Sequence, residues 1–215
     1  MRKRERDIFS AVKANDFHVV QRLLAEGHDV NELSYDQMTP IFEVRSAAMV
    51  KLLVNSGADV HAKDDHKRSV LHWVTDGEAA KALIEAGAGV NYVNRSGGYS
   101  CFNSPLHNAM RSDETEVIKV LIEAGADVNA RDNYGETPLF ASRNVRAAQL
   151  LIEAGAVINA INHGGLTAIQ SIREWRAELA EFVETRGSKG EQANLQTTIP
   201  AAQPEPVKRK AKAFI

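Results

Sequence analysis

The sequence contains little cysteine and few aromatic residues. Cys101 is the single cysteine among 215 residues, and aromatic side chains make up 6% of the chain. One cysteine excludes an internal disulfide framework, and without a Cys-x-x-Cys pair or a Cys/His cluster a structural zinc ion has no ligands. The shortage of aromatic residues predicts a core built from Ala, Leu, Ile and Val.

Long apolar segments are also missing. No segment approaches the roughly 20 apolar residues that span a bilayer, and the charged start MRKRERDIF is not followed by the roughly 7–15 apolar residues of a secretory signal. The formal net charge is −2, too small for a polyanion mimic or a general nucleic-acid binder. We therefore expect a soluble cytoplasmic protein that does not enter a membrane, with a host-cell or nuclear location left open.

Motifs that carry catalytic chemistry are absent as well. The sequence has no Gly-rich phosphate loop, no His-Glu-x-x-His motif and no paired-carboxylate motif. Cys101 and His107 are near in sequence, but no third group is evident to orient the histidine, so thiol catalysis is not expected. These absences predict a protein that is not an enzyme and that holds no cofactor and no metal.

The sequence does contain an internal repeat. A nine-residue phrase, such as LIEAGADVN at residues 121–129, occurs five times, and its glycines are separated by 30, 30, 38 and 30 residues. A second phrase, such as ETPLF, places a Thr or Ser 12, 12, 17, 12 and 12 residues after those glycines. Two anchors that share one period indicate stacked structural units. The repeated glycines are Gly27, Gly57, Gly87, Gly125 and Gly155.

Residues 104–129, SPLHNAMRSDETEVIKVLIEAGADVN, resemble the ankyrin repeat with its T-P-L-H-x-A motif. The resemblance extends over about residues 7–187. It implies an all-α solenoid of about six stacked helix-turn-helix units, including caps, with β-hairpin loops that we call fingers. We accordingly divide the chain into a repeat domain, residues 1–187, and a disordered basic tail, residues 188–215.

Most units are shorter than the family period of 33 residues. The distance from the Thr or Ser to the following Leu is 14 residues in three internal units and 17 in residues 104–121. This difference predicts a helix pair about one turn shorter in those units.

The repeated phrases also predict local roles. Thr39, Thr137, Ser69 and Ser104 are expected to cap the first helix of each pair with their hydroxyls, and the glycines are expected to end the second helix in a left-handed conformation. The core should contain Ile41, Leu71, Leu106, Leu139 and Ile169 from the first helices, and Trp73 between units. The family resemblance implies a structural hydrogen-bonding role for His72 and His107.

Arginines recur at one register and suggest a basic stripe. Arg45, Arg143 and Arg173 lie six residues after the Thr of their units, and Arg111 lies seven after its Ser. The resemblance puts this register on the concave side, where a stripe would suit carboxylates of a partner. The alternative is local pairing with Asp76, Asp113 or Glu43.

The fingers supply the other candidate contacts. The third finger is five residues longer than the others and carries Arg95, Tyr99, Cys101 and Phe102 beside Gly97-Gly98, as a binding loop would, although a tolerated insertion is the alternative. The remaining finger tips are expected to be exposed and to touch a partner. They hold Tyr35, Asp36, Asp64, Asp65, His66, Asn133, Tyr134, Asn162 and His163.

The tail differs in composition from the repeats. It is rich in Ala, Gln, Pro and Lys, and its basic cluster is similar to a short nuclear-import signal or nucleic-acid contact, while a solubilising end is the plainer interpretation. The cluster consists of Lys208, Arg209, Lys210 and Lys212.

The sequence therefore predicts a monomeric protein-interaction module. It would act as a scaffold, adaptor or inhibitor that binds a partner with acidic and apolar surface through its concave face and finger tips. The alternative is a nuclear or nucleic-acid-associated adaptor recruited by the tail, since nucleic acid would be reached through the tail alone.

Overall fold

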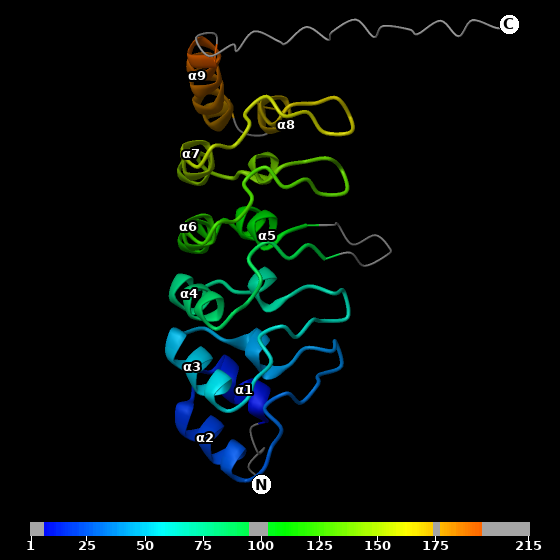
Figure 1. The fold of residues 1–215 in the computed structure, drawn as a ribbon, viewed down its shortest axis with the longest axis vertical. Coiled ribbons are helices and arrows are strands. Elements are labelled where there is room, and N and C mark those ends of the chain that lie inside the picture. The colour runs from blue at the N-terminus through cyan, green and yellow to red at the C-terminus, as the bar shows by residue number, and fades with distance from the viewer. Residues whose placement is uncertain (1–6, 95–102, 174–176, 195–215) are drawn as a thin grey trace, which may run out of the picture.

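Pairs of helical segments are stacked into an elongated array, with helices α1 and α2 toward one end and α9 at the other (Figure 1). The structure is a computed structural model that describes residues 7–94, 103–173 and 177–194. In each of the six units described, an inner segment is followed by an outer helix, and fingers lead from one unit to the next (Figure 1). The prediction of an all-α repeat solenoid is confirmed.

The inner segments form one row and the outer helices a second, parallel row (Figure 1). The inner segments are α1 (Ile8–Lys13), η1 (Pro40–Glu43), η2 (Val70–His72), α5 (Pro105–Ser112), η3 (Pro138–Ala141) and α8 (Ala168–Arg173). The outer helices are α2 (Phe17–Ala25), α3 (Ala47–Asn55), α4 (Gly77–Glu85), α6 (Thr115–Glu123), α7 (Val145–Glu153) and α9 (Ala177–Asn194).

The missing residues of the short units come from the inner row. In the unit with the longer spacing, α5 is an α-helix of 8 residues, whereas η1, η2 and η3 are single 3-10 turns of 4, 3 and 4 residues. The outer helices α3, α4, α6 and α7 all have 9 residues. The predicted loss of about one turn is therefore confirmed, and it falls entirely on the inner segment.

The outer helices have clear start and stop signals. Ser46, Asp76 and Asn144 cap α3, α4 and α7 by accepting a hydrogen bond from a backbone N–H in the first turn. After the C-cap, Gly57 (φ +91°) and Gly125 (φ +84°) adopt the left-handed conformation that the repeat predicted. These signals give α3, α4 and α7 the same length of 9 residues.

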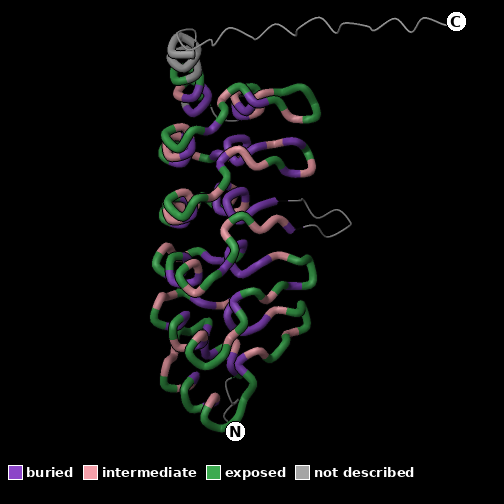
Figure 2. Tube along the Cα trace, in the orientation of Figure 1, coloured by how far each residue is buried: buried purple, intermediate pink, exposed green. Residues whose placement is uncertain are grey.

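Small and branched apolar side chains fill the space between the two helical rows, where buried residues concentrate (Figure 2). Ile41, Leu71, Leu106 and Leu139 are at most 1% exposed, as predicted, and Ile169 packs half-buried against the same core. Trp73 was predicted to join this core, but it is 38% exposed. Its position at the end of the short segment η2 directs it out of the core toward a finger.

The hydroxyl caps predicted for the inner segments are only partly present. Ser69 and Ser104 place Oγ 2.9 Å from Nδ1 of His72 and His107, respectively, each three residues later in its inner segment. The prediction is wrong for Thr39 and Thr137, whose buried hydroxyls have no hydrogen-bond partner in the described part of the chain. The reason is local, because phenylalanine stands where the serine-capped units have histidine.

The fingers turn back like hairpins, but they are too short to contain strands. Backbone bonds such as Ser34 N–Met38 O (2.9 Å) and Asp132 N–Glu136 O (2.9 Å) close them. Among the described residues the β-structure amounts to two isolated bridges, Lys63–Ser69 and Ile161–Thr167, which replace the predicted β-hairpins.

Helix α9 extends past the predicted end of the repeat domain. The boundary was placed after Gly187, whereas α9 continues to Asn194. The basic cluster at residues 208–212 lies outside the described residues. Among the residues described, none of the helices has the length and apolar composition of a membrane-spanning segment.

Candidate protein-binding surface

The fingers are held by one hydrogen-bonding side chain at the start of each turn. Asp64 and Asp132 are 1% and 5% exposed, and their carboxylates accept backbone N–H groups of the turn. Asn162 does the same for Gly164 and Leu166, and Asn94 accepts the N–H of Asn103 at 2.9 Å. Asp64 was predicted to be an exposed tip residue, and this is wrong because its carboxylate is needed inside the turn. Asn94, Asp132 and Asn162 stand at the position equivalent to Asp64 in the later fingers, and this recurrence is the sequence signal for its role inside the turn.

Neighbouring fingers are also bonded to one another near their tips. Asp65 N donates to Asp36 O (3.1 Å), and His163 N donates to Tyr134 O (2.8 Å). Arg131 Nη1 donates to the carbonyl oxygens of Gly135 in its own finger (2.8 Å) and Ile161 in the next (2.7 Å). These bonds join the tips in two pairs, the first finger with the second and the fourth with the fifth, so each pair can present side chains without a large ordering cost.

Two side-chain-bearing residues occupy the left-handed turn position of the fingers. Gly135 (φ +73°) and Gly165 (φ +76°) hold it in two fingers, and Gln37 (φ +57°) and Lys67 (φ +60°) hold it in the first two. A residue with a Cβ is strained in this conformation. The fingers therefore keep one turn geometry even where glycine has been lost.

Asparagine side chains that follow the outer helices form hydrogen bonds to the backbone of the next unit. Asn31 donates to Gly57 O (2.9 Å) and accepts from Asp59 N (2.8 Å), and Asn91 bonds in the same way to Gly125 O (2.9 Å) and Asp127 N (2.8 Å). Asn129 repeats the pattern with Gly155 and Val157. We call this series of bridges the asparagine ladder. His61 stands at the equivalent position between the second and third units, so the ladder is interrupted there.

Trp73 is held in a fixed orientation where the inner row meets the fingers. Its Nε1 donates to Asp64 Oδ2 (3.0 Å), and the guanidinium of Arg68 lies 4.3 Å from the centre of the indole ring. Arg68 Nε donates to the same Asp64 oxygen at 2.7 Å. A buried carboxylate thus orients a half-exposed tryptophan and the arginine stacked on it. Sequence reasoning missed this cluster because its members belong to different repeated phrases.

The base of the third finger packs onto the second. The ring of Tyr92 lies 4.4 Å below Lys63 Nζ and meets His72 edge to face at 6.2 Å. Its ends are closed by Asn94 N–Asn103 O (3.3 Å). The predicted contact residues of this finger, Arg95, Tyr99 and Phe102, lie outside the described residues, as does Cys101.

The predicted tip residues of the other fingers are mostly exposed. Tyr35 is 99% and Tyr134 is 53% exposed, and Asn133 is half-buried. The rest of this set lie on the surface, at the ends of the fingers, where Figure 2 shows mainly exposed chain. These are Asp36, Asp65, His66 and His163. The tips are thus available to a partner, and their role in binding stays a prediction.

The arginines of the predicted basic stripe differ in exposure and in contacts. Arg45 and Arg143 are exposed and directly precede the caps of α3 and α7. Arg111 is half-buried and donates to Asp132 Oδ2 of the next finger at 3.2 Å. Arg173 ends α8, and its side chain is not among those described.

The alternative local partners of these arginines have other contacts. Glu43 pairs with Lys13 (3.1 Å), Asp76 caps α4, and Asp113 accepts a hydrogen bond from Asn144. In the described part of the chain, Arg45 and Arg143 make no ion pair. The basic stripe therefore remains a prediction that rests on these two exposed side chains.

The two family histidines are structural. His72 Nε2 lies 3.1 Å from Asn103 O, and His107 Nε2 lies 3.2 Å from Glu136 O. Burial lowers the pKa of His72 to about 4 and also lowers the pKa of His107. Both rings are thus neutral at pH 7 with both nitrogens engaged, which confirms the structural prediction for these residues.

The described residues do not bring together three or more His, Cys, Asp or Glu side chains that could hold a metal ion. What the geometry provides is a rigid, ridged surface with an oriented Trp–Arg pair, exposed arginines and a row of tips. Such a surface is suited to binding a macromolecule.

The family follows from comparison with known sequences. The family profile described as "Ankyrin repeats (3 copies)" matches residues 8–94 and 76–162. The two matches together cover more than half of the chain, and the chain belongs to the ankyrin-repeat family. Ankyrin repeats are protein–protein interaction modules and are generally not enzymes. No curated protein matches the chain significantly.

Solved structures show the same fold. The ankyrin repeat domain of Bcl-3, described as a unique member of the IkappaB protein family, is 25% identical with a TM-score of 0.69, over 85% of each chain. EF0377, an ankyrin repeat protein, is 20% identical with a TM-score of 0.66, over 82% of this chain and 96% of its own.

A third similar chain comes from a complex of two proteins. That structure contains the predatory endopeptidase Bd0816 from Bdellovibrio bacteriovorus with the immunity protein Bd3460. The matching chain is 21% identical with a TM-score of 0.68, over 83% of this chain and 96% of its own.

Proposed function

We propose that this chain binds a protein partner through its finger row and inner segments, and acts as a scaffold, adaptor or inhibitor by tethering or covering that partner. The observation that carries this proposal is Trp73, 38% exposed and oriented by Asp64 and Arg68. A large side chain that is already ordered loses little entropy on binding, and Trp and Arg are enriched among residues that dominate interface energies.

The surrounding surface supports the same function. Arg45 and Arg143 offer exposed guanidinium groups, and Tyr35 and Tyr134 offer exposed rings at the finger tips. These side chains suit a partner with apolar pockets and carboxylates. The Bdellovibrio structure shows an array of this fold within a two-protein complex, which is a precedent for the architecture.

The first experiment compares two equally exposed apolar side chains. Tagged wild-type protein, Trp73→Ala and the control Val145→Ala would be used to capture partners from native extract, with quantitative mass spectrometry. Val145 is also 38% exposed but begins the outer helix α7. We expect Trp73→Ala to lower capture of the principal partner about 10-fold or more, as at an interface hot spot, and Val145→Ala to retain it.

Folding must be monitored so that the comparison is informative. Trp73→Phe keeps a ring at the site but loses the bond to Asp64, and its circular dichroism and urea midpoint would be measured beside those of Trp73→Ala. Equal capture by folded Trp73→Ala and wild type would reject this surface as the binding site.

A second experiment tests the basic stripe. Arg45→Glu/Arg143→Glu should weaken capture if the partner presents carboxylates there, while Arg22→Glu/Arg146→Glu reverses two exposed charges on outer helices. Equal effects of the two double variants would mean that general charge, and not the stripe, controls binding.

A further inference from the structure

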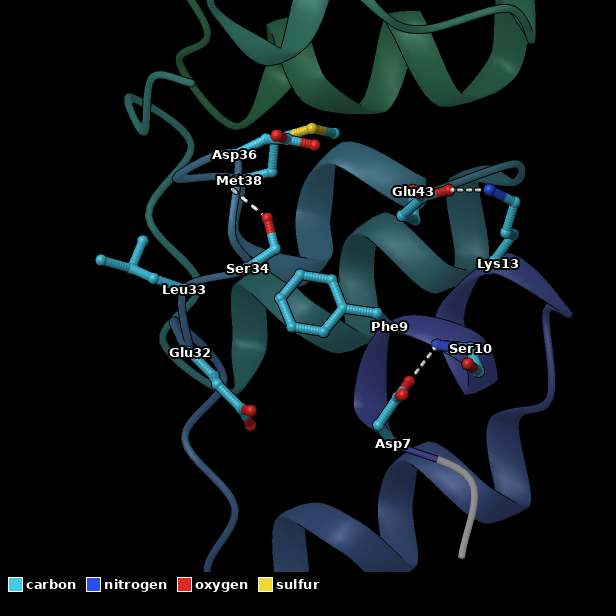
Figure 3. A pocket seen from close by; sticks show the side chains of 10 residues that line it. All are labelled: Asp7, Phe9, Ser10, Lys13, Glu32, Leu33, Ser34, Asp36, Met38 and Glu43. Carbon is cyan, nitrogen blue, oxygen red and sulfur yellow. Dashed lines mark hydrogen bonds and ion pairs between the residues drawn. The ribbon is translucent and has the colours of Figure 1, made fainter. Parts of the chain in front are cut away.

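A groove lies at the N-terminal end of the array, between α1, the first finger and the turn η1 (Figure 3). Its volume is about 480 Å³. Phe9 from α1 and Leu33 and Met38 from the first finger supply its apolar lining. Phe9 and Met38 are half-buried against the core, and Leu33 is 57% exposed. The groove therefore combines fixed apolar walls with one apolar side chain that water reaches freely.

The charged side chains around this groove are mostly acidic. Among the described residues that line it, Asp7, Glu32, Asp36 and Glu43 are acidic and Lys13 is the one cation. Lys13 Nζ is already paired with Glu43 at 3.1 Å, so among the described lining residues three carboxylates are left without an opposite charge (Figure 3). The whole chain carries a net charge of only −2, so the groove concentrates negative charge in one place.

The walls of the groove are preorganised. Ser34 Oγ accepts Met38 N (3.1 Å), and Ser34 N donates to Met38 O (2.9 Å), which closes the first finger. The second finger supports it through Asp65 N–Asp36 O (3.1 Å), and Asp7 caps α1 through Ser10 N (2.7 Å). A ligand would enter a shape that exists before binding, which lowers the entropic cost.

We propose that this groove binds a segment of a partner protein in which Lys or Arg residues stand beside a bulky apolar side chain. The apolar side chain would cover Phe9, Leu33 and Met38, and the cations would meet Glu32, Asp36 and Asp7. The proposed segment is positively charged, whereas Arg45 and Arg143 would select carboxylates on a partner. The groove therefore defines a second contact. It rests on the proposed function only in taking the ligand to be a protein segment.

The test uses full-length protein and a short fluorescent peptide of alternating basic and apolar residues, followed by fluorescence anisotropy. Two control peptides replace the apolar residues with Ser or the basic residues with Glu. We expect the basic–apolar peptide to bind more tightly than both controls. Raising the salt concentration toward about 1 M should weaken it, because the Debye length falls to about 3 Å.

Variants locate the binding. Glu32→Gln/Asp36→Asn should lower the affinity for the basic–apolar peptide roughly 3- to 10-fold, since each exposed ion pair contributes modestly to binding. The matched control Glu78→Gln/Glu85→Gln removes two exposed carboxylates from α4 and should leave the affinity unchanged. Leu33→Ser should also weaken it. Equal affinity for all three peptides, or equal effects of the two double variants, would overturn the proposal.

Other occupants are separated by the same assay. Residues 1–6 contain four basic side chains and one acidic one and directly precede Asp7. If Arg2→Gln/Lys3→Gln/Arg4→Gln tightens peptide binding, the chain's own start competes for the groove and the partner assignment fails. If sedimentation shows oligomers that Lys208→Gln/Arg209→Gln/Lys210→Gln abolishes, the occupant is the tail of another copy. Unchanged affinity and a monomer support the proposal.

The peptide assay is independent of partner capture at Trp73. Loss of peptide binding with capture intact would remove the groove proposal alone. Peptide binding in a chain that captures no partner would remove the proposed function and leave the groove a peptide site.

Discussion

The Nε2 atom of His72 lies 3.1 Å from the carbonyl oxygen of Asn103, a residue 31 positions further along the chain, where the next unit begins. His107 makes the same bond to Glu136 O at 3.2 Å. In the units with Phe42 and Phe140 at this position, phenylalanine cannot make this bond, and the neighbouring threonine hydroxyls are buried without a partner among the described residues. The inner segments are thus joined to the next unit in two ways, by a histidine hydrogen bond or by a packed phenylalanine, while asparagine and finger-tip hydrogen bonds link units of both kinds.

The polar junction makes stability depend on pH. In the folded state the pKa of His72 is about 4, below the unfolded value of 6.5, so acidification protonates the unfolded chain first. Stability should therefore be lost as the pH falls from about 6.5 to 4, by on the order of 3 kcal/mol from His72.

The measurement is urea unfolding at pH 7.5 and at pH 4.5 for wild type and His72→Phe. At pH 7.5 the variant should be less stable by about 1–2 kcal/mol, because the hydroxyl of Ser69 and Asn103 O lose their partner. Its pH dependence should be shallower than that of wild type. The same slope in both proteins would show that His72 does not control the acid transition.

The interrupted asparagine ladder predicts a stabilising substitution. His61→Asn would place an amide where Asn31, Asn91 and Asn129 bridge to the next unit, so it should bond to the backbone of Gly87 and Gly89. We expect a gain of about 1 kcal/mol in the free energy of unfolding, measured by urea denaturation. His28→Asn, at an exposed position outside the ladder, is the control and should change little. A neutral His61→Asn would refute the ladder as a source of stability.

The left-handed turn position gives a pair of opposite predictions. Lys67→Gly should stabilise by roughly 0.5–1 kcal/mol, because relief of the strained conformation exceeds the entropy that glycine adds to the unfolded chain. Gly135→Ala should destabilise by more than about 1 kcal/mol, since φ is +73° there and an added Cβ would lie 2.7 Å from the ring of His163. Thermal denaturation of both variants tests the signs, and a stabilised Gly135→Ala would contradict the assigned turn.

The carboxylate of Asp64 should control the exposed tryptophan. Asp64→Ala leaves Trp73 Nε1 and the buried turn without their acceptor, and it should lower the free energy of unfolding by about 2 kcal/mol. The neighbouring Asp65→Ala, at an exposed position, should cost less than about 0.5 kcal/mol. Acrylamide quenching of tryptophan fluorescence should increase in Asp64→Ala alone. Equal quenching in both variants would show that Asp64 does not orient the indole.

Much of the fold could be predicted from the repeated phrases. The repeated glycines marked the order of five units, and the 14- against 17-residue spacing predicted the shorter helix pair. The core positions Leu71 and Leu139 followed from their place after the cap. These features are local, because helix ends, turns and apolar periodicity depend on residues within a few positions of one another.

The surface was less predictable, as Trp73 and Asp64 illustrate. Trp73 was expected inside and is half-exposed, while Asp64 was expected outside and is 1% exposed. They are nine residues apart and bond to each other across the junction of turn and finger. Neither the repeated phrases nor the apolar periodicity indicates that these two side chains will form a hydrogen bond.

By itself, the sequence determined the repeat, the ends of the outer helices and the family, since each depends on residues that are close together in the sequence. The tertiary structure decided where the short units lost their turn and which polar groups became buried. It also placed α1 beside the first finger to form an acidic, apolar groove. The physical reason is that stacking brings together residues about 30 positions apart, and their burial and charge depend on that contact.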